Sequence, residues 1–216
     1  RIAELTLYQN AAYAQRYADM IERVQATEAG KAKGKTGLAE TVGEAYFKLL
    51  AYKDEYEVAR LLITSRDKAR AQFDGDFNMT FHMAPPLLSK MGPNGRPQKR
   101  EFGQWLEGPL RVMAKFKGLR GTPFDPFGYS AERRAERALV EEYGALLHAL
   151  AKGLNAQNAA RAIAIAQSVS QVRGYGPVKE ESMAAWRALV GRELPEFRDR
   201  ASDACAPGEA IGEVIA

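Results

Sequence analysis

Apolar side chains recur at spacings of three and four residues over most of this 216-residue chain, and this period constrains the fold more than any other feature. The first apolar stripe predicts a helix from about Ile2 to Ala29. A second helix is expected to begin at a cap on Thr36 and to continue to about Ile63. Because only a short basic linker joins them, the two long helices should form an antiparallel hairpin.

One segment departs from the helical period. Between Phe77 and Met83, apolar and polar residues alternate strictly, with His82 on the polar side, as in a strand that is buried on one face. A Pro-Pro pair follows this strand, and Gln98–Phe102 is the expected returning strand. The sequence therefore predicts a mainly α fold, with long antiparallel helices and one small β-hairpin around residues 76–102.

Helical stripes return in the second half of the chain. The residues expected to begin or cap these helices are Gly108, Ser130, Asn155 and Pro177. The helix that Ser130 caps should continue to about Gly153. We expect a single helical domain over residues 1–195, followed by a polar tail, residues 196–216, that frays.

Composition limits the class of protein. The 31 Lys and Arg residues exceed the 27 Asp and Glu residues by only four, which is too weak a basic balance to require nucleic acid. No apolar run approaches the roughly 20 residues that span a bilayer, so no membrane association is expected. Cys205 is the single cysteine, and it can form neither an internal disulfide nor the four-thiolate site of an iron–sulfur cluster. A reducing, cytoplasmic setting is expected.

Familiar catalytic motifs do not fit. Phe77 follows Gly75 and Asp76 at the place where the Gly-Asp-Gly motif of thiamine diphosphate sites requires glycine, and neither a dinucleotide-binding glycine pattern nor a Walker loop occurs. The histidines, His82 and His148, lie in different expected elements, and no Cys, Asp or Glu stands at ligand spacing from His82. We therefore expect no catalytic, cofactor-binding or metal-binding residue in this segment.

Cationic groups gather near the start of the expected helix after Ser130. Positive charge from Arg133 and Arg134 in a first helical turn opposes the helix dipole, at a cost of roughly a few tenths of a kcal/mol. We expect Asp125 to neutralise Arg120 or Arg133 within the domain. The alternative is that these arginines face outward and dock on an acidic patch elsewhere.

A second charged segment covers residues 52–60. It is either a solvated helix face or a docking surface for the arginines of the later helix. With the basic residues that flank the last helix, these positions form a candidate interaction surface. Its members are Glu55, Arg60, Arg120, Asp125, Arg133, Arg134, Arg137, Arg173 and Lys179.

Five segments together resemble the C-terminal region of the fused indolepyruvate ferredoxin oxidoreductases, in the 2-oxoacid:acceptor oxidoreductase family. They follow the order of that family across most of the chain. The segments are Tyr52–Arg60, Phe81–Pro86, Lys99–Gly103, Leu119–Gly128 and Arg173–Glu180.

The resemblance implies a parent enzyme that oxidatively decarboxylates arylpyruvates to aryl-acetyl-coenzyme A, with thiamine diphosphate, magnesium, an iron–sulfur cluster and ferredoxin. The cofactor motifs of the family have no counterpart in this sequence, and they are expected upstream. The chain would then be a non-catalytic structural or assembly domain whose partners are the upstream catalytic domains, and a homodimer is an open alternative. The contrasting hypothesis is an independent basic helical module that binds nucleic acid or another anionic partner.

Overall fold

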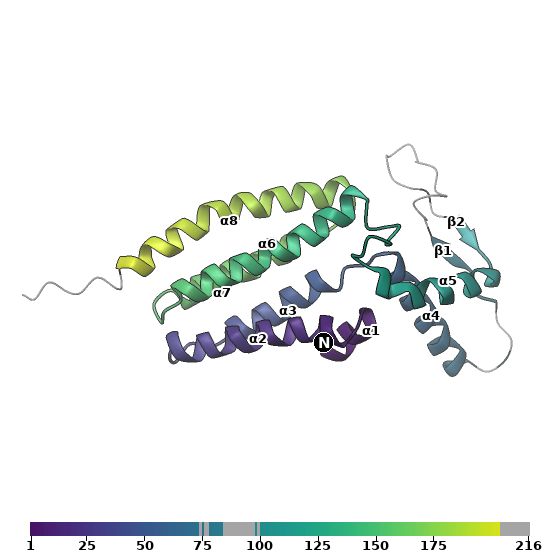
Figure 1. Cartoon of the computed structure of the whole chain (residues 1–216), viewed down its shortest axis with the longest axis horizontal. Coiled ribbons are helices and arrows are strands. Elements are labelled where there is room, and N and C mark those ends of the chain that lie inside the picture. The colour runs from purple at the N-terminus through teal and green to yellow at the C-terminus, as the bar shows by residue number, and fades with distance from the viewer. Residues whose placement is uncertain (74, 76–77, 84–97, 99, 204–216) are drawn as a thin grey trace, which may run out of the picture. The chain divides into compact units, whose positions relative to one another are not determined.

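The computed structural model describes residues 1–73, 75, 78–83, 98 and 100–203. These residues form a mainly helical structure with one small two-stranded antiparallel sheet, which confirms the predicted fold class (Figure 1). The helices are α1 (Ile2–Tyr8), α2 (Ala11–Lys31), α3 (Leu38–Leu50), α4 (Glu55–Gln72), α5 (Glu107–Lys115), α6 (Ala131–Gly153), α7 (Ala159–Gln167) and α8 (Pro177–Asp203). The strands are β1 (Phe81–Met83) and β2 (Arg100–Phe102), and short 3-10 turns cover Gln104–Leu106, Phe116–Leu119 and Ser168–Gln171.

The chain divides into two compact units, and the sequence pattern had predicted a single domain over residues 1–195. Residues 1–51 and the chain from residue 130 onward form the first, which we call the helical unit. Residues 52–129 form the second, which we call the insert unit because it interrupts the first between α3 and α6.

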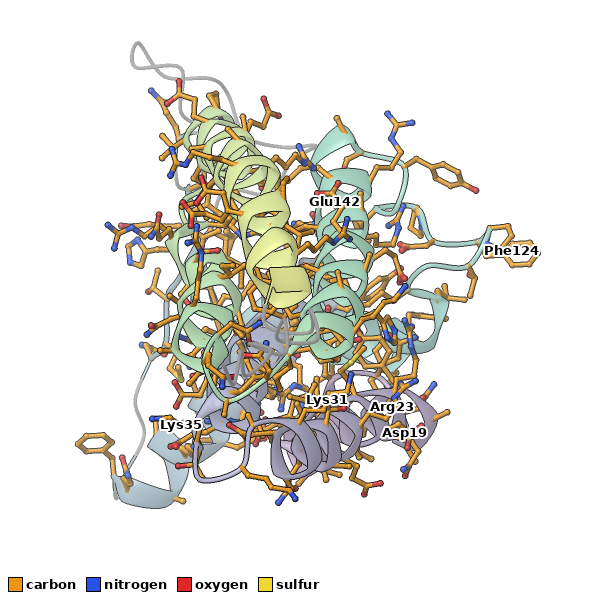
Figure 2. All side chains as sticks on the ribbon, turned by 90° about the vertical axis from the view of Figure 1, so that its left-hand side faces the viewer. Asp19, Arg23, Lys31, Lys35, Phe124 and Glu142 are labelled. Carbon is orange, nitrogen blue, oxygen red and sulfur yellow. The ribbon has the colours of Figure 1, made fainter. Side chains whose placement is uncertain are left out.

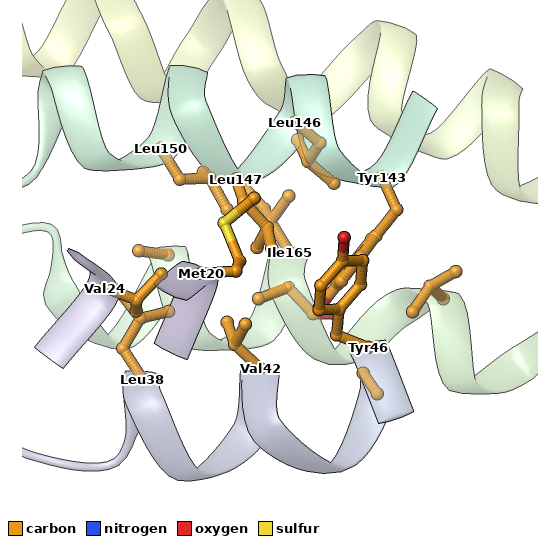
Figure 3. Close-up of a cluster of buried hydrophobic side chains, with 14 of the residues drawn as sticks. Met20, Val24, Leu38, Val42, Tyr46, Tyr143, Leu146, Leu147, Leu150 and Ile165 are labelled. Carbon is orange, nitrogen blue, oxygen red and sulfur yellow. The ribbon is translucent and has the colours of Figure 1, made fainter. Parts of the chain in front are cut away.

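The core of the helical unit is built from the predicted apolar stripes. Figure 3 shows Val42 and Tyr46 of α3 facing Tyr143 and Leu147 of α6, with Met20 of α2 beside them. All five side chains are buried. Buried tyrosines need a partner for the hydroxyl group, and the Tyr143 hydroxyl donates to the carbonyl oxygen of Ala166 at 3.0 Å. Burial raises the pKa of Tyr143 above its ordinary value.

The first two predicted helices are each divided in two. Asn10 interrupts the first, because its side chain accepts a hydrogen bond from the Tyr13 amide at 2.8 Å and caps a new helix, α2. Asp54 interrupts the second in the same way by accepting from the Glu57 amide at 2.9 Å. Asn and Asp at such positions compete with a continuous helix by bonding to the backbone.

The start of α3 is capped by a distant side chain and not by Thr36. Its first residue is Leu38, after Gly37 in the left-handed conformation. The carboxylate of Glu28, at the end of α2, accepts from the amides of Leu38 at 2.6 Å and Ala39 at 3.2 Å. This contact joins α2 to α3, which run side by side in opposite directions as predicted (Figure 1).

Residues 196–203 belong to a helix and not to a frayed tail, because α8 continues to Asp203 through Pro195. Proline removes one helical hydrogen bond and usually ends a helix. Here Phe197 is fully buried in the core of the helical unit, and burial of such a side chain is worth roughly 1.5–3 kcal/mol. Arg161 of α7 also pairs with Glu193 of α8, on the N-terminal side of the proline, at 2.9 Å. Residues 204–216 of the predicted tail lie outside the described residues.

The insert unit has a small core of its own, between α4, α5 and the sheet. Phe81 is buried there with Ala59 and Leu110. From residue 78 to residue 83 the exposure alternates as predicted, with His82 on the exposed side, while Phe77 lies outside the described residues. Phe81 pairs with Phe102 across the sheet, so the returning strand is within the predicted segment.

The faces of this strand generate a prediction. Phe81→Ala should destabilise the chain by about 3–5 kcal/mol, because it removes a buried ring and leaves a cavity. His82→Ala should be nearly neutral, because the side chain of His82 is 57% exposed. Denaturant melts of the two variants measure the difference, and a larger loss for His82→Ala would show that the faces are reversed.

Candidate interaction site in the insert unit

Two segments singled out from the sequence meet inside the insert unit. Asp54, from the segment 52–60, pairs with Arg120, from the segment 119–128. The Arg120 Nε and Nη2 atoms donate to the Asp54 Oδ2 and Oδ1 atoms at 2.5 Å and 2.8 Å. Each side chain is 4% exposed. This is a bidentate, charge-assisted contact, and it is strong and specific in direction.

The position of Asp54 at the start of α4 helps to offset the cost of burying its charge. Its carboxylate accepts from the Glu57 amide as the N-cap, and it stands at the positive end of the helix dipole. Buried ion pairs are tolerated only where additional hydrogen bonds satisfy the remaining polar atoms. Asp54 meets that condition with Arg120 and the backbone together.

Tyr56 and Asp125 form a second buried contact beside this pair. The Tyr56 hydroxyl donates to the Asp125 Oδ1 atom at 3.1 Å. The Arg120 guanidinium carbon lies 5.6 Å from the centre of the Tyr56 ring, within the range of cation–π attraction. Burial, followed by the hydrogen bond to Asp125, raises the pKa of Tyr56 above its ordinary value.

Asp125 also organises the loop in which it lies. Its carboxylate accepts from the amides of Gly121 at 3.0 Å and Phe127 at 3.2 Å. Gly121 has a φ of +75°, which favours glycine. A Cβ atom on Gly128 would lie 2.7 Å from the Asp125 Oδ2 atom, so this site also requires glycine. The loop is therefore held by its own contacts although it has no regular secondary structure.

This loop presents aromatic groups to solvent. Phe124 is 80% exposed and points away from the ribbon (Figure 2). Tyr129 is 63% exposed, and its hydroxyl donates to the Pro123 carbonyl oxygen at 2.6 Å. The Phe124 amide donates to the Thr122 hydroxyl at 3.2 Å. A fixed loop that exposes an aromatic side chain can bind a partner with little loss of conformational entropy.

A third polar group lies next to the Asp54–Arg120 pair. Glu57 accepts two hydrogen bonds from Arg60, at 2.8 Å and 2.7 Å. Lys117 is partly buried in the same region. Burial, and then the positive charges of Arg60 and Arg120, lower the pKa of Lys117.

The predicted interaction residues belong to both units. Arg120 and Asp125 are buried in the insert unit, where they support the loop, and Glu55 and Arg60 of that unit are half-buried. The other five, Arg133, Arg134, Arg137, Arg173 and Lys179, belong to the helical unit.

An internal carboxylate partner exists for both Arg120 and Arg133. It is Asp54 for Arg120, and for Arg133 it is Glu136, at 2.5 Å, whereas the predicted partner was Asp125. The buried Glu136 also pairs with Lys179 and so joins α6 to α8. Ser130 caps α6 as predicted by accepting from the Arg133 amide.

One buried cation of the insert unit was missed in the sequence. Arg66 of α4 is 3% exposed and pairs with Asp67 and with Glu107 of α5. No motif marks this residue, because a charged residue in a helix gives no sign of the distant helix that will cover it.

Within the described residues, no three His, Cys, Asp or Glu side chains are grouped to hold a metal ion. The helices there are too short or too polar for any of them to cross a membrane. The described features are those of a helical protein with an inserted α+β unit that is fixed by buried ion pairs.

The chain belongs to a family of unknown function, DUF6537, whose family model matches residues 1–192. Comparisons with curated proteins and with solved structures gave no match.

The Asp54–Arg120 pair generates a prediction about stability. Arg120→Met leaves the Asp54 carboxylate buried without its cation and should cost about 3–5 kcal/mol in the free energy of unfolding. Arg187→Met, which removes a pair with Glu142 that is 46% and 38% exposed, should cost less than about 1 kcal/mol. Denaturant melts compare the two variants.

A double variant tests whether the loss in the free energy of unfolding comes from the interaction between Asp54 and Arg120. Asp54→Asn combined with Arg120→Met should be less destabilised than the sum of the two single variants, because neither buried charge remains. Strict additivity would show that Arg120 and Asp54 act independently.

The buried tyrosines generate a prediction about alkaline pH. Tyr46, Tyr56 and Tyr143 have pKa values raised first by burial, so the folded chain keeps protons that the unfolded chain loses near pH 10. The resulting stability is fully present below pH 10 and is lost as the pH rises through the folded-state pKa values. Tyr56→Phe should therefore reduce the fall in stability above pH 10, measured by denaturant melts. An identical fall in the variant would contradict the shift for Tyr56.

Proposed function

We propose that this chain is a non-catalytic assembly domain of a larger cytoplasmic oxidoreductase that resembles indolepyruvate ferredoxin oxidoreductase. The parent would convert arylpyruvates to aryl-acetyl-coenzyme A with ferredoxin as acceptor. Its thiamine diphosphate, magnesium and iron–sulfur cluster would be held by upstream catalytic domains. The resemblance of five ordered segments supports the parentage.

One observation carries the assembly role, namely the fixed loop that exposes Phe124. Interfaces draw most of their binding energy from a few residues, with aromatic groups prominent among them. The Phe124 ring is exposed, while the backbone beneath it is held by Asp125 and Thr122. A partner that covers this ring would gain apolar burial without having to order the loop.

The internal contacts of the matching segments support the same role. The segments 52–60 and 119–128 hold each other through Asp54 with Arg120 and through Tyr56 with Asp125. These charged groups are thus engaged in shaping the insert unit. Their arrangement favours a structural role, in which they position an interaction surface, over a catalytic role.

The test uses this chain and the separately produced catalytic part of its parent polypeptide. The chain alone should give no arylpyruvate-dependent reduction of a viologen dye. The two parts should co-purify, and Phe124→Ala should weaken their association at least about tenfold. The melt of the isolated chain should not change, because the ring is 80% exposed.

Tyr175→Ala is the matched control, because Tyr175 is an aromatic residue of the helical unit that is 73% exposed. It should leave the association unchanged. Turnover by the chain alone would refute the non-catalytic assignment. Equal association of the Phe124 and Tyr175 variants would refute the loop as the docking element.

A second candidate function, binding of nucleic acid, is favoured by the distribution of charge. Residues 52–129 contain 13 Lys and Arg against 9 Asp and Glu, whereas the rest of the chain has 18 of each. The whole net charge of +4 therefore lies in the insert unit. A shift assay on duplex DNA over a range of salt concentrations separates this function from the first, since phosphate contacts weaken steeply with salt.

A further inference from the structure

One exposed face of α5 and of the 3-10 turns on either side of it carries apolar residues that are not part of the insert unit's core. Val112 and Phe116 are one helical turn apart, and Trp105, in the preceding 3-10 turn, precedes Val112 by two turns. Their exposed fractions are 55%, 52% and 68%. We call these three residues the outer stripe.

A different face of α5 already packs against the core. Leu110 is buried there, and Leu106 and Met113 lie half-buried beside it. The outer stripe is thus a second apolar face on one short helix. The Trp105 ring contacts the Phe102 ring edge-on, with centroids 6.1 Å apart, which holds one end of the stripe against β2. Single exposed apolar residues are ordinary, but an aligned set marks an interaction site.

Most carboxylates of the described insert unit are engaged with groups of the same unit. Asp54 pairs with Arg120, Glu57 with Arg60, and both Asp67 and Glu107 with Arg66. Asp125 accepts from Tyr56 and from backbone amides, and Glu101 lies 3.8 Å from His82. Apart from the exposed Glu101, these acidic groups are therefore occupied within the unit.

Several cations remain without such a partner. Lys53, Lys68, Arg100 and Lys115 are exposed, and no carboxylate among the described residues forms an ion pair with any of them. Lys115 lies beside the outer stripe, three residues after Val112 and one before Phe116. The apolar face therefore has a positive edge.

We propose that the outer stripe binds an acidic protein segment that carries apolar side chains at helical spacing. The stripe covers roughly 16 Å along the helix direction, at about 1.5 Å per residue, which matches three turns of a partner helix. Carboxylates on that helix would meet Lys115 while its apolar residues cover Val112 and Phe116. This proposal does not depend on the proposed assembly function.

The distribution of charge selects this occupant over two others. A second copy of the chain would bring one insert unit with a surplus of four positive charges against another, and like charges repel. The phosphates of a nucleic acid would pair with the cations. Its bases would stack on aromatic rings and would make little contact with the aliphatic Val112.

The experiment uses two synthetic peptides with the same leucines at positions i, i+3, i+4 and i+7, one filled with glutamate and one with lysine. The readout is shielding of Trp105 from acrylamide, because Trp186, the other tryptophan, is already buried. The glutamate peptide should shield Trp105, and added salt should weaken the effect. The lysine peptide should bind at least about tenfold more weakly.

Substitutions locate the site. Val112→Ala should weaken binding of the glutamate peptide about tenfold, and Lys115→Glu should reverse the preference between the peptides. Lys68→Glu, a matched change of an exposed cation on α4, should alter neither. Melting curves should be unchanged for all three, since the side chains are exposed.

Three outcomes would overturn the proposal. The first is no shielding by the glutamate peptide at millimolar concentration, or equal shielding by both peptides. The second is self-association, seen by sedimentation, that Val112→Ala abolishes, which would identify a second copy as the occupant. The third is shielding of Trp105 by a single-stranded oligonucleotide that competes with the glutamate peptide, which would identify a nucleic-acid surface.

Discussion

The ion pair between Asp54 and Arg120 is the contact on which the insert unit depends. It joins the first turn of α4 to a loop 66 residues later in the chain, and both partners are withdrawn from water. Such a pair is stable only if every polar atom around it is satisfied. The helix cap at Asp54, the Tyr56 ring over the guanidinium and the Asp125 carboxylate follow from that requirement.

The same contacts determine which side chains of the insert unit are exposed. Asp54, Glu57 and Glu107 pair with Arg120, Arg60 and Arg66. Lys53, Lys68 and Lys115 are exposed and form no ion pair with a carboxylate of the described residues. The loop that Asp125 fixes exposes Phe124. The ion pairs of the buried arginines and the hydrogen bonds of Asp125 therefore favour a surface with exposed cations and an exposed aromatic group.

The helical unit uses its charges differently. Its 18 cations and 18 carboxylates balance, and the most buried carboxylates connect helices. Glu28 caps α3 from α2, and Glu136 joins α6 to α8. The buried carboxylates of this unit hold helices together, while the insert unit has a surplus of four positive charges.

The sequence by itself determined the helical stripes, the alternation around Phe81 and the cap at Ser130, because these patterns are local. A side chain that faces a core recurs with the period of its own element, whatever the core is made of. The break at Asp54 could also have been predicted from the sequence, because Asp followed by Glu three residues later resembles a capping box.

Only the tertiary structure decided which charges are buried and which face water. Arg120 and Arg134 are alike in sequence, yet one is enclosed with Asp54 and the other is exposed. The continuation of α8 past Pro195 was decided in the same way, by burial of Phe197. The physical reason is that desolvation and ion pairing depend on residues distant in the chain, and no local pattern specifies those neighbours.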